Sequence, residues 1–550
     1  MKPIRRSAKS CLAALVLLVA PSAFAHDNAP NPTKTSTVAL DPGLGSLHHP
    51  VSTRNRQAQM YFDQGLKLVF AFNHEAAIQS FAHAAELDPD LAMAHWGIAL
   101  ALGPNINHPM DAKAHKAAYE ALQKAIALKS KASMAERAYI DALSKRYSAN
   151  AEADVEPLQL AYNDAMKELV RRYPQDIDVA VLYAESLMNL DPWKFWAPDG
   201  TPAKGTQEIV AVLERALARS PRHIGANHYY IHAVEASPHP EKALPSAKRL
   251  ETLAPSAGHL VHMPAHTYIR TGDYLAAARA NVAAVRADER TAKLGINTFY
   301  MIGYYGHNLH FLAIANAFAG NSREAIAAAN KLYAFEAPRI REVPPVDGFL
   351  FTPALLLVEF GRWDDILALP EPAFEAALTG ALWHFARTLA FAGKGEANRA
   401  QAERVKFLEV ADAVPKTMEF GNNDAAGVLA VARPYLDGRL ALMAGNNAGA
   451  IALLRLAVVA EDALAYDEPP GWYLPSRDAL GVALLRDCDY PAAEQVYRDE
   501  LKLHPESGRA LFGLGAALAG QGRDREAAAV RVRFERAWRA ADVKLEAGAM

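Results

Sequence analysis

Apolar residues recur every three to four positions along most of this chain. From about residue 56 to residue 545, Ala, Leu, Glu and Arg dominate, and the strict alternation typical of half-buried strands is nearly absent. Such spacing is typical of amphipathic α-helices that turn one apolar face toward a core. We therefore expect an all-α fold of paired helices over this region, without a sheet.

The helical pattern repeats at an interval of 34 residues. In residues 58–91, repeat positions 8, 11, 20, 24, 27 and 32 are held by Gly65, Leu68, Ala77, Phe81, Ala84 and Pro89. The same register gives Gly481, Leu484, Ala493, Tyr497 and Pro505 in residues 474–507, and Gly515, Gly522 and Ala527 in residues 508–541. This register resembles the tetratricopeptide repeat (TPR), whose helix–turn–helix units stack into a right-handed superhelical solenoid. The resemblance implies that fold here.

Longer phrases extend the resemblance over nearly the whole mature chain. They are Phe72-Asn73-His74-Glu75-Ala76-Ala77, Leu102-Gly103-Pro104-Asn105-Ile106-Asn107, the stretch from His262 to Tyr274, and Glu468-Pro469-Pro470-Gly471-Trp472-Tyr473. Together they resemble a bacterial group of exported, histidine-rich TPR proteins that has no assigned activity. The run Pro475-Ser476-Arg477-Asp478 is more acidic than the group's pattern, which leaves the role of Asp478 open.

The first 25 residues have the pattern of an export signal. Its basic start contains Lys2, Arg5, Arg6 and Lys9, followed by an apolar run from Cys11 to Ala20 and the small-residue site Ala23-Phe24-Ala25. That run is too short to span a bilayer, and no later stretch is long enough, so we expect no membrane span. The mature protein should begin near His26 and be periplasmic or secreted.

The rest of the chain divides by composition and register. We expect an extended N-terminal arm at residues 26–57, N-terminal repeats at 58–223, histidine-rich repeats at 224–340 and C-terminal repeats at 341–550. A loop at residues 191–205 carries Trp193, Phe195 and Trp196. Two interpretations of this loop stay open: a lid over a groove, or aromatic side chains that pack under a long loop.

The net charge and the cysteine content bear on the type of partner and on the source of stability. Without the four basic residues of the signal, 54 Lys and Arg remain against 61 Asp and Glu, a net charge of −7. This balance argues against a nucleic-acid partner. Cys488 is the one cysteine after the signal, so we expect no internal disulfide, and stability must come from core packing.

Three histidine clusters fall in the middle of the repeats. Their members are His228, His232 and Glu235, then His259, His262 and His266, then His307 and His310. At about 100° per residue, the members of each of the first two clusters lie within an arc of roughly 60° on one helix face. Histidines scattered through a core would not keep this phase, so the pattern predicts a site.

The clusters also share the repeat register. In units that start at residues 224, 258 and 306, the clustered residues take repeat positions 2, 5, 9 and 12. In TPR domains such positions on the first helix line the concave groove. The resemblance therefore implies that the clustered histidines face the groove, while residues such as Ile231 and Val261 form the packing stripe.

Neighbouring imidazoles disfavour one another's charged form, so they should be neutral at pH 7 and available as ligands. His228 and His232, like His262 and His266, have the i, i+4 spacing that lets two rings reach one ion. We expect a transition metal (zinc, copper or iron) held by some of His228, His232, His259, His262, His266, His307 and His310. Two alternatives remain: groove histidines without a metal, and core histidines bonded to backbone.

Glu235 follows His232 by one helical turn. It is a candidate metal ligand, a residue that orients a ligand, or a general base, against the plain alternative of a solvated helix residue. Tyr229 stands where zinc peptidases carry the glutamate after their first histidine, so no peptidase motif is present. Pro264 lies within the second cluster and predicts a kink beside His262 and His266.

Two functions follow from these patterns. In the first, the groove is a metal site and the protein is a metal-dependent hydrolase or oxidase. In the second, it is a TPR scaffold whose groove holds a peptide, a protein segment or a small molecule without catalysis. Peptide-binding TPR grooves tend to use Lys, Arg and Asn, whereas this one offers imidazole, which favours the metal. The sequence leaves open whether the protein is an enzyme.

Overall fold

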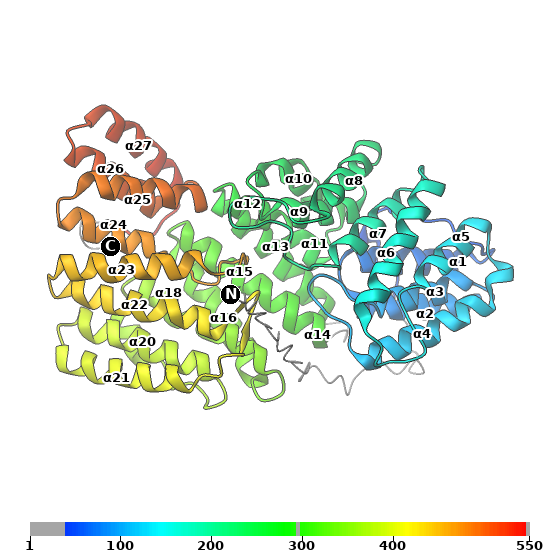
Figure 1. Ribbon diagram of the computed structural model, residues 1–550, viewed down its shortest axis with the longest axis horizontal. Helices are drawn as coiled ribbons and strands as arrows, with labels where there is room; N and C mark the ends of the chain where they lie inside the picture. The colour runs from blue at the N-terminus through cyan, green and yellow to red at the C-terminus, as the bar shows by residue number, and fades with distance from the viewer. Residues whose placement is uncertain (1–38, 293–297, 546–550) are drawn as a thin grey trace, which may run out of the picture.

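A computed structural model describes residues 39–292 and 298–545 of the chain. The expected export signal and residues 26–38 of the expected arm lie outside the described residues, so those predictions remain untested. The described chain folds as an all-α superhelical solenoid of TPR-like helix pairs (Figure 1).

The helices follow one another in pairs along the solenoid. The N-terminal helices are α1 (Arg56–Phe70), α2 (His74–Leu87), α3 (Ala92–Ala101), α4 (Ala112–Ala127), α5 (Met134–Leu143), α6 (Val155–Arg172), α7 (Ile177–Met188) and α8 (Thr206–Arg219). The central helices are α9 (Ile224–Val234), α10 (Leu244–Leu253), α11 (Gly258–His262), α12 (Pro264–Arg270), α13 (Tyr274–Ala292), α14 (Thr298–Tyr300), the π-helix η4 (Met301–Tyr305), α15 (Gly306–Phe318), α16 (Ser322–Glu336), α17 (Asp347–Leu350), α18 (Thr352–Glu359) and α19 (Trp363–Ala368). The C-terminal helices are α20 (Ala377–Gly393), α21 (Ala397–Ala413), α22 (Ala425–Met443), α23 (Asn447–Asp462), α24 (Ser476–Arg486), α25 (Tyr490–Leu503), α26 (Gly508–Gly520) and α27 (Asp524–Ala537).

Short 3-10 turns complete the list of helical elements. They are η1 (Pro42–Leu44), η2 (Lys129–Lys131), η3 (Pro240–Ala243), η5 (Ala337–Arg339) and η6 (Pro344–Val346). The expectation of no sheet is wrong in one place, where β1 (Glu419–Phe420) pairs antiparallel with β2 (Asn423–Asp424). Gly421 joins these strands at φ 56°, a left-handed conformation that glycine adopts without strain and that permits the tight turn.

The 34-residue register has a steric basis in its glycine and aromatic positions. A Cβ on Gly65 of α1 or on Gly97 of α3 would lie 2.6 Å or 2.5 Å from the ring of Phe81 on α2. The aromatic ring therefore wedges between two helices that only glycine lets approach. Gly481 and Gly513 stand in the same relation to Tyr497 on α25, with contacts of 2.3 Å and 2.1 Å. Both ends of the chain thus use one packing device.

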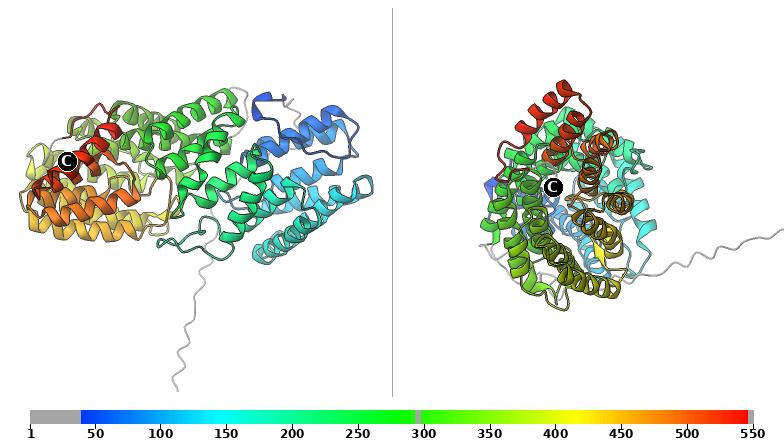
Figure 2. Two further views of the ribbon diagram at one scale, coloured as in Figure 1. Left: turned by 90° about the horizontal axis from the view of Figure 1, so that it is seen from above. Right: turned by 90° about the vertical axis from the view of Figure 1, so that its left-hand side faces the viewer.

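The C-terminal repeats close back onto the central ones (Figure 2). Arg270 of α12 donates to the carbonyl oxygen of Leu503 at 3.3 Å, and the Tyr274 hydroxyl donates to that of Pro505 at 2.8 Å. The backbone N–H of Ser322 donates to Asp542 at 2.7 Å. These contacts join segments separated by more than 200 residues, so the C-terminal repeats pack against the central ones.

The described part of the arm, residues 39–55, runs along the first and central repeats. The Ser256 hydroxyl donates to Asp41 at 3.1 Å, which fixes the arm beside the turn between α10 and α11. His49 Nδ1 lies 2.7 Å from one oxygen of Asp178, and His223 Nε2 lies 2.8 Å from the other. The arm is therefore anchored by a buried histidine–carboxylate–histidine chain.

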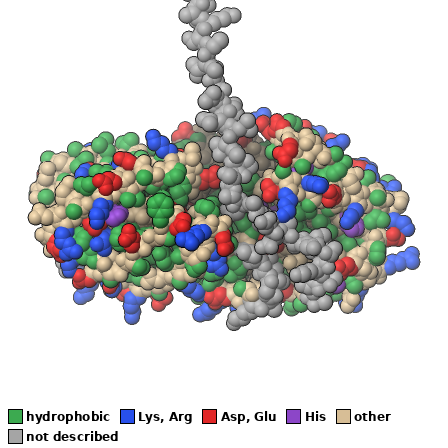
Figure 3. Space-filling view, turned by 90° about the horizontal axis from the view of Figure 1, so that it is seen from below, with side chains coloured by type: hydrophobic (Ala, Val, Ile, Leu, Met, Phe, Trp, Pro, Cys, Tyr) green, Lys and Arg blue, Asp and Glu red, His purple; other side chains and the backbone are tan. Residues whose placement is uncertain are grey.

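The surface of the solenoid mixes charges of both signs. On the face shown in Figure 3, Lys and Arg side chains alternate with Asp and Glu side chains over the visible repeats. Among the described residues, no helix combines the length and the apolar character that a membrane span requires.

Candidate metal centre

The clustered histidines come together at the middle of the solenoid. His228 and His232 lie on α9, His259 and His262 on α11, His266 on α12, and His307 and His310 on α15. All of them are at most 4% exposed except His307, which is half-buried. Six of the seven belong to two groups of three whose ligand atoms lie within 4.8 Å of one another.

Pro264 divides the predicted helix as expected. α11 ends at His262 and α12 begins at Pro264, because proline has no N–H to continue the hydrogen-bond ladder. Across this break, Nε2 of His262 lies 2.8 Å from Nε2 of His266. The kink therefore aims both rings at one point.

We call His228, His232 and His259 group 1. Nε2 of His228 lies 3.0 Å from Nε2 of His259, and the rings of His228 and His232 have centroids 4.9 Å apart. Group 2 contains His262, His266 and His307. The ring of His307 lies 4.7 Å from that of His262 and 5.7 Å from that of His266.

His310 is not brought into either group. It lies three residues after His307 on α15, and its ring is turned away from both groups. Its ring contacts Phe349 and Tyr473 with centroid distances of 5.5 Å and 5.7 Å. Burial lowers the pKa of His310 to about 3, so it is a neutral core histidine.

Oxygen atoms lie against the Nδ1 atoms of four of the six grouped histidines. Nδ1 of His228 lies 2.7 Å from the carbonyl oxygen of Phe70, at the end of α1. Nδ1 of His262 lies 2.7 Å from Oδ1 of Asn281 on α13. The amide nitrogen of Asn281 donates to the Ala277 carbonyl at 2.9 Å, which turns Oδ1 toward the histidine.

Glu235 joins the two groups. One carboxylate oxygen lies 2.7 Å from Nδ1 of His232, and the other lies 2.5 Å from Nδ1 of His266. Burial alone would raise the pKa of Glu235, but His266 and His232 outweigh it and hold that pKa at about 2. At 1% exposure, Glu235 is not the solvated residue of the plain alternative. It occupies the position of a carboxylate that orients histidine ligands.

These contacts fix where the ring protons lie. A carbonyl or carboxylate oxygen only accepts, so each Nδ1 bound to one carries the hydrogen, and Nε2 of a neutral ring keeps a lone pair. His228, His232 and His262 are held in this way, while His266 pairs with Glu235 as an ion pair. Nε2 of His262 therefore keeps a lone pair and faces Nε2 of His266 at 2.8 Å, where it can accept a proton from His266 or bind a metal cation.

Burial controls the protonation of the groups. Desolvation and then the neighbouring histidines lower the pKa of His228, His259, His262 and His307 well below the ordinary value of 6.5. These rings are therefore neutral at pH 7 and can donate a lone pair. Burial also disfavours charge on His266, but Glu235 outweighs it and raises the pKa of that ring.

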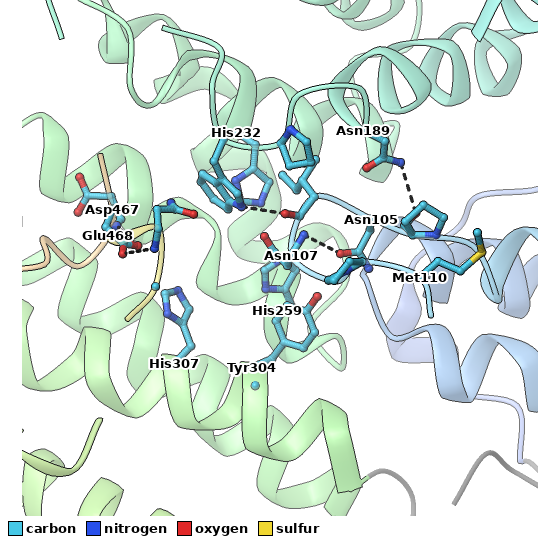
Figure 4. Close-up of a pocket in the computed structure, with 18 of the residues that line it drawn as sticks. Asn105, Asn107, Met110, Asn189, His232, His259, Tyr304, His307, Asp467 and Glu468 are labelled. Atoms are coloured by element: carbon cyan, nitrogen blue, oxygen red, sulfur yellow. Dashed lines mark hydrogen bonds between the residues drawn. The ribbon is translucent and has the colours of Figure 1, made fainter. Parts of the chain in front are cut away.

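A cavity of about 590 Å³ opens onto both groups (Figure 4). His232 and His259 of group 1 and His266 and His307 of group 2 line it. The lining also includes polar amides and aromatic rings, among them Asn105, Asn107, Asn189, Trp193, Phe299 and Tyr304. The π-helix η4 presents Gly303 and Tyr304, a helical irregularity that often occurs at functional sites.

The loop at residues 191–205 fits each of its two interpretations, a lid and a packed aromatic loop, in part. Trp193 lines the cavity, and its ring meets that of His232 edge-on at 5.3 Å. Its indole N–H donates to the Ile106 carbonyl at 2.9 Å. Phe195 is 5% exposed and packs under the loop, while Trp196 donates to the Ala233 carbonyl at 2.8 Å. One aromatic residue thus covers the cavity and the other two support it.

Two carboxylates on the cavity wall were not predicted as site residues. Asp467 and Glu468 come from the loop between α23 and α24 and face the cavity. Burial raises the pKa of each to about 7. The sequence signal was the phrase that begins at Glu468, which marked a resemblance but gave no spatial relation to the histidines.

Several solved structures of helical repeat proteins resemble the chain at a distance. No family model matches the chain, and no curated protein matches it. A human IFIT1 dimer with m7Gppp-AAAA has a TM-score of 0.32 and 13% identity, over 82% of this chain and 90% of that one. Yeast Tom70 has a TM-score of 0.29 and 12% identity, over 86% and 90%. The P58(IPK) TPR domain has a TM-score of 0.23 and 12% identity, over 85% and 99%. Likeness this distant carries no argument about activity or partners.

Proposed function

We propose that this protein binds a transition metal through the histidines of groups 1 and 2. The observation that supports it best is the set of oxygen acceptors on Nδ1 of His228, His232 and His262, which leaves their Nε2 lone pairs in a buried space. Outer partners of this kind accompany most metal-bound histidines and set their tautomer. Zinc, copper and iron are the candidates, because imidazole suits all three.

The distances within each group fit a metal after small ring movements. In a tetrahedral site with metal–nitrogen bonds of about 2.0–2.1 Å, the ligand nitrogens are about 3.3 Å apart. The nitrogen pairs at 3.0 Å and 2.8 Å lie close to that spacing, and the remaining pairs lie within 4.8 Å. Three protein ligands would leave a coordination position open toward the cavity, as in catalytic metal sites.

An enzymatic role follows if the cavity admits a substrate. An open metal position lets an ion polarise a bound oxygen or lower the pKa of a bound water. Asp467 and Glu468 lie on the same cavity wall and would accept or donate protons near neutral pH. We place this activity in the periplasm or outside the cell, as the export signal and the resemblance to exported histidine-rich TPR proteins suggest.

The alternative is a scaffold that binds a peptide or protein segment without metal. The residues that line the described cavity include no Lys or Arg, so this cavity lacks the cations that hold peptide carboxylates in TPR grooves. Metal content therefore separates the two functions better than a peptide screen does.

The test is metal analysis of mature protein purified without a histidine tag. The parent should retain a transition metal, and His232→Ala and His262→Ala should lose most of it. His384→Ala is the matched control, because His384 is half-buried and held by Glu403 at 2.6 Å outside both groups. If the parent takes up no metal after dialysis against zinc, copper or iron salts, the metal function is wrong and the scaffold function is favoured.

A further inference from the structure

Groups 1 and 2 are adjacent rather than separate. The rings of His232 in group 1 and His266 in group 2 have centroids 5.5 Å apart. The rings of His259 in group 1 and His262 in group 2 lie 5.8 Å apart and nearly stacked. These spacings are close to those within each group, which range from 4.7 to 6.1 Å. Ions bound to the two groups would therefore be neighbours.

A single carboxylate orients one ligand from each group. Glu235 binds Nδ1 of His232 with one oxygen and Nδ1 of His266 with the other. Its backbone carbonyl accepts from Arg270 at 3.1 Å, which fixes the start of the turn after α9. The position of either histidine thus depends on the same side chain, and the two groups are mechanically coupled.

Both groups open into one cavity. Each contributes two lining histidines, so a ligand in the cavity reaches both at once. His228 and His262 lie behind them, fully buried and held from the protein side. This arrangement leaves the open coordination positions of both groups facing the same small volume.

The ligand chemistry favours copper over iron or manganese. All six ligand candidates are imidazoles, whereas di-iron and di-manganese centres in helical proteins are built mainly from carboxylates. Imidazole sites bind copper most tightly among the divalent first-row metals. Imidazole ligands bring no negative charge, so Glu235 and the cavity carboxylates would balance the charge of the ions, which suits copper in its monovalent state as well.

We infer that groups 1 and 2 form one dinuclear copper centre, in which the two ions share a small oxygen ligand at the floor of the cavity. This inference rests on the proposed metal function and adds to it the number of ions, their identity and the class of ligand between them. Hydroxide is the simplest such ligand, and a phenolate oxygen is another that the aromatic cavity wall would accommodate.

The test uses the mature, untagged protein loaded with copper(II) and desalted. We expect two copper ions per chain, one for each three-histidine group. Copper(II) ions that share an oxygen ligand couple their spins, so the electron paramagnetic resonance signal should account for only a small part of the copper. A single ion per chain, or a full signal from uncoupled copper, would overturn the dinuclear centre while leaving metal binding intact. No bound copper in protein that retains zinc would overturn the choice of metal, and no bound metal at all would overturn the proposed function.

Variants of each group sharpen the result. His307→Ala removes a half-buried ligand of group 2 and should leave one copper ion per chain with a full signal, since the groups hold one ion each. His228→Gln should do the same for group 1 and serves if another variant fails to fold. His384→Ala should keep both ions and the weak signal. If His307→Ala loses neither copper nor spin coupling, group 2 is not part of the centre.

Discussion

The carbonyl oxygen of Phe70 lies 2.7 Å from Nδ1 of His228, although 158 residues separate them in the chain. Phe70 is the last residue of α1, where helix carbonyls have no partner within the helix and carry the negative end of the dipole. The N-terminal repeat therefore supplies the acceptor that sets the tautomer of a histidine in the central repeats. Residues far from the histidines in sequence should control the site.

Gly225→Ala tests this dependence. A Cβ on Gly225 would lie 2.5 Å from the Phe70 ring, so the substitution must displace Phe70 and with it the acceptor for His228. We expect a loss of about 1–3 kcal/mol in the free energy of unfolding from overpacking, together with weaker metal binding. Gly515→Ala is the control, because its new Cβ would meet only Val530 at an ordinary 3.9 Å. Competition with a chelator and thermal unfolding measure both effects.

Glu235→Gln should weaken metal binding with little effect on packing. The amide of glutamine offers one oxygen and one NH2 group, so it can accept from only one of the two Nδ1–H groups that Glu235 now holds. The other ring must turn or change tautomer and lose its ligand lone pair. Loss of such an outer partner costs about 10–100-fold in metal affinity. Glu241→Gln, at an exposed pair with His239, should leave the affinity unchanged.

His310 should make the metal-free protein less stable in acid. Its pKa is about 3 in the folded state against an ordinary 6.5, because burial disfavours its charged form. The unfolded chain therefore binds a proton that the folded chain does not between these values, and stability falls as pH drops through this window. The slope is about 1.4 kcal/mol per pH unit for one group.

Comparison of the parent with His310→Gln isolates this contribution, since the other titrating groups are common to both proteins. From pH 7 to pH 5, the parent should lose about 2 kcal/mol more unfolding free energy than the variant. Urea unfolding at the two pH values measures the difference. Equal losses in both proteins would show that His310 gains a proton while folded.

Trp193 should report copper binding. Its ring meets that of His232 at 5.3 Å, so copper(II) at group 1 should quench its fluorescence. We expect Trp193→Phe to remove most of the quenching while the protein still binds copper. Trp363→Phe, on α19, is the matched control and should leave the quenching in place. Quenching that is the same in all three proteins would place the copper elsewhere.

The sequence predicted the fold because the repeat register depends on local and nearest-neighbour packing. Gly65 and Phe81 could be read as a pair without knowledge of the rest of the chain, and so could Gly481 and Tyr497. The small hairpin at Gly421 was not predicted, because strands of two residues leave no periodic pattern in the sequence.

The histidine phase likewise placed six rings on a common site, but it could not show their partners. Phe70 and Asn281 contact His228 and His262 through tertiary packing. The spacing of residues along the sequence does not show such contacts. His310 had the right register and is still turned away, because its ring packs against Phe349 and Tyr473 instead.

In an open repeat array, terminal units can be removed one at a time, because each unit touches only its neighbours. In this chain the C-terminal repeats also contact central repeats that are distant in sequence. The backbone carbonyls of Leu503 and Pro505 accept hydrogen bonds from Arg270 and Tyr274. Arg270 is the last residue of α12, the helix that bears His266. The histidine centre therefore cannot be transplanted as a two-repeat module, nor can the C-terminal repeats be lost by truncation without reaching it.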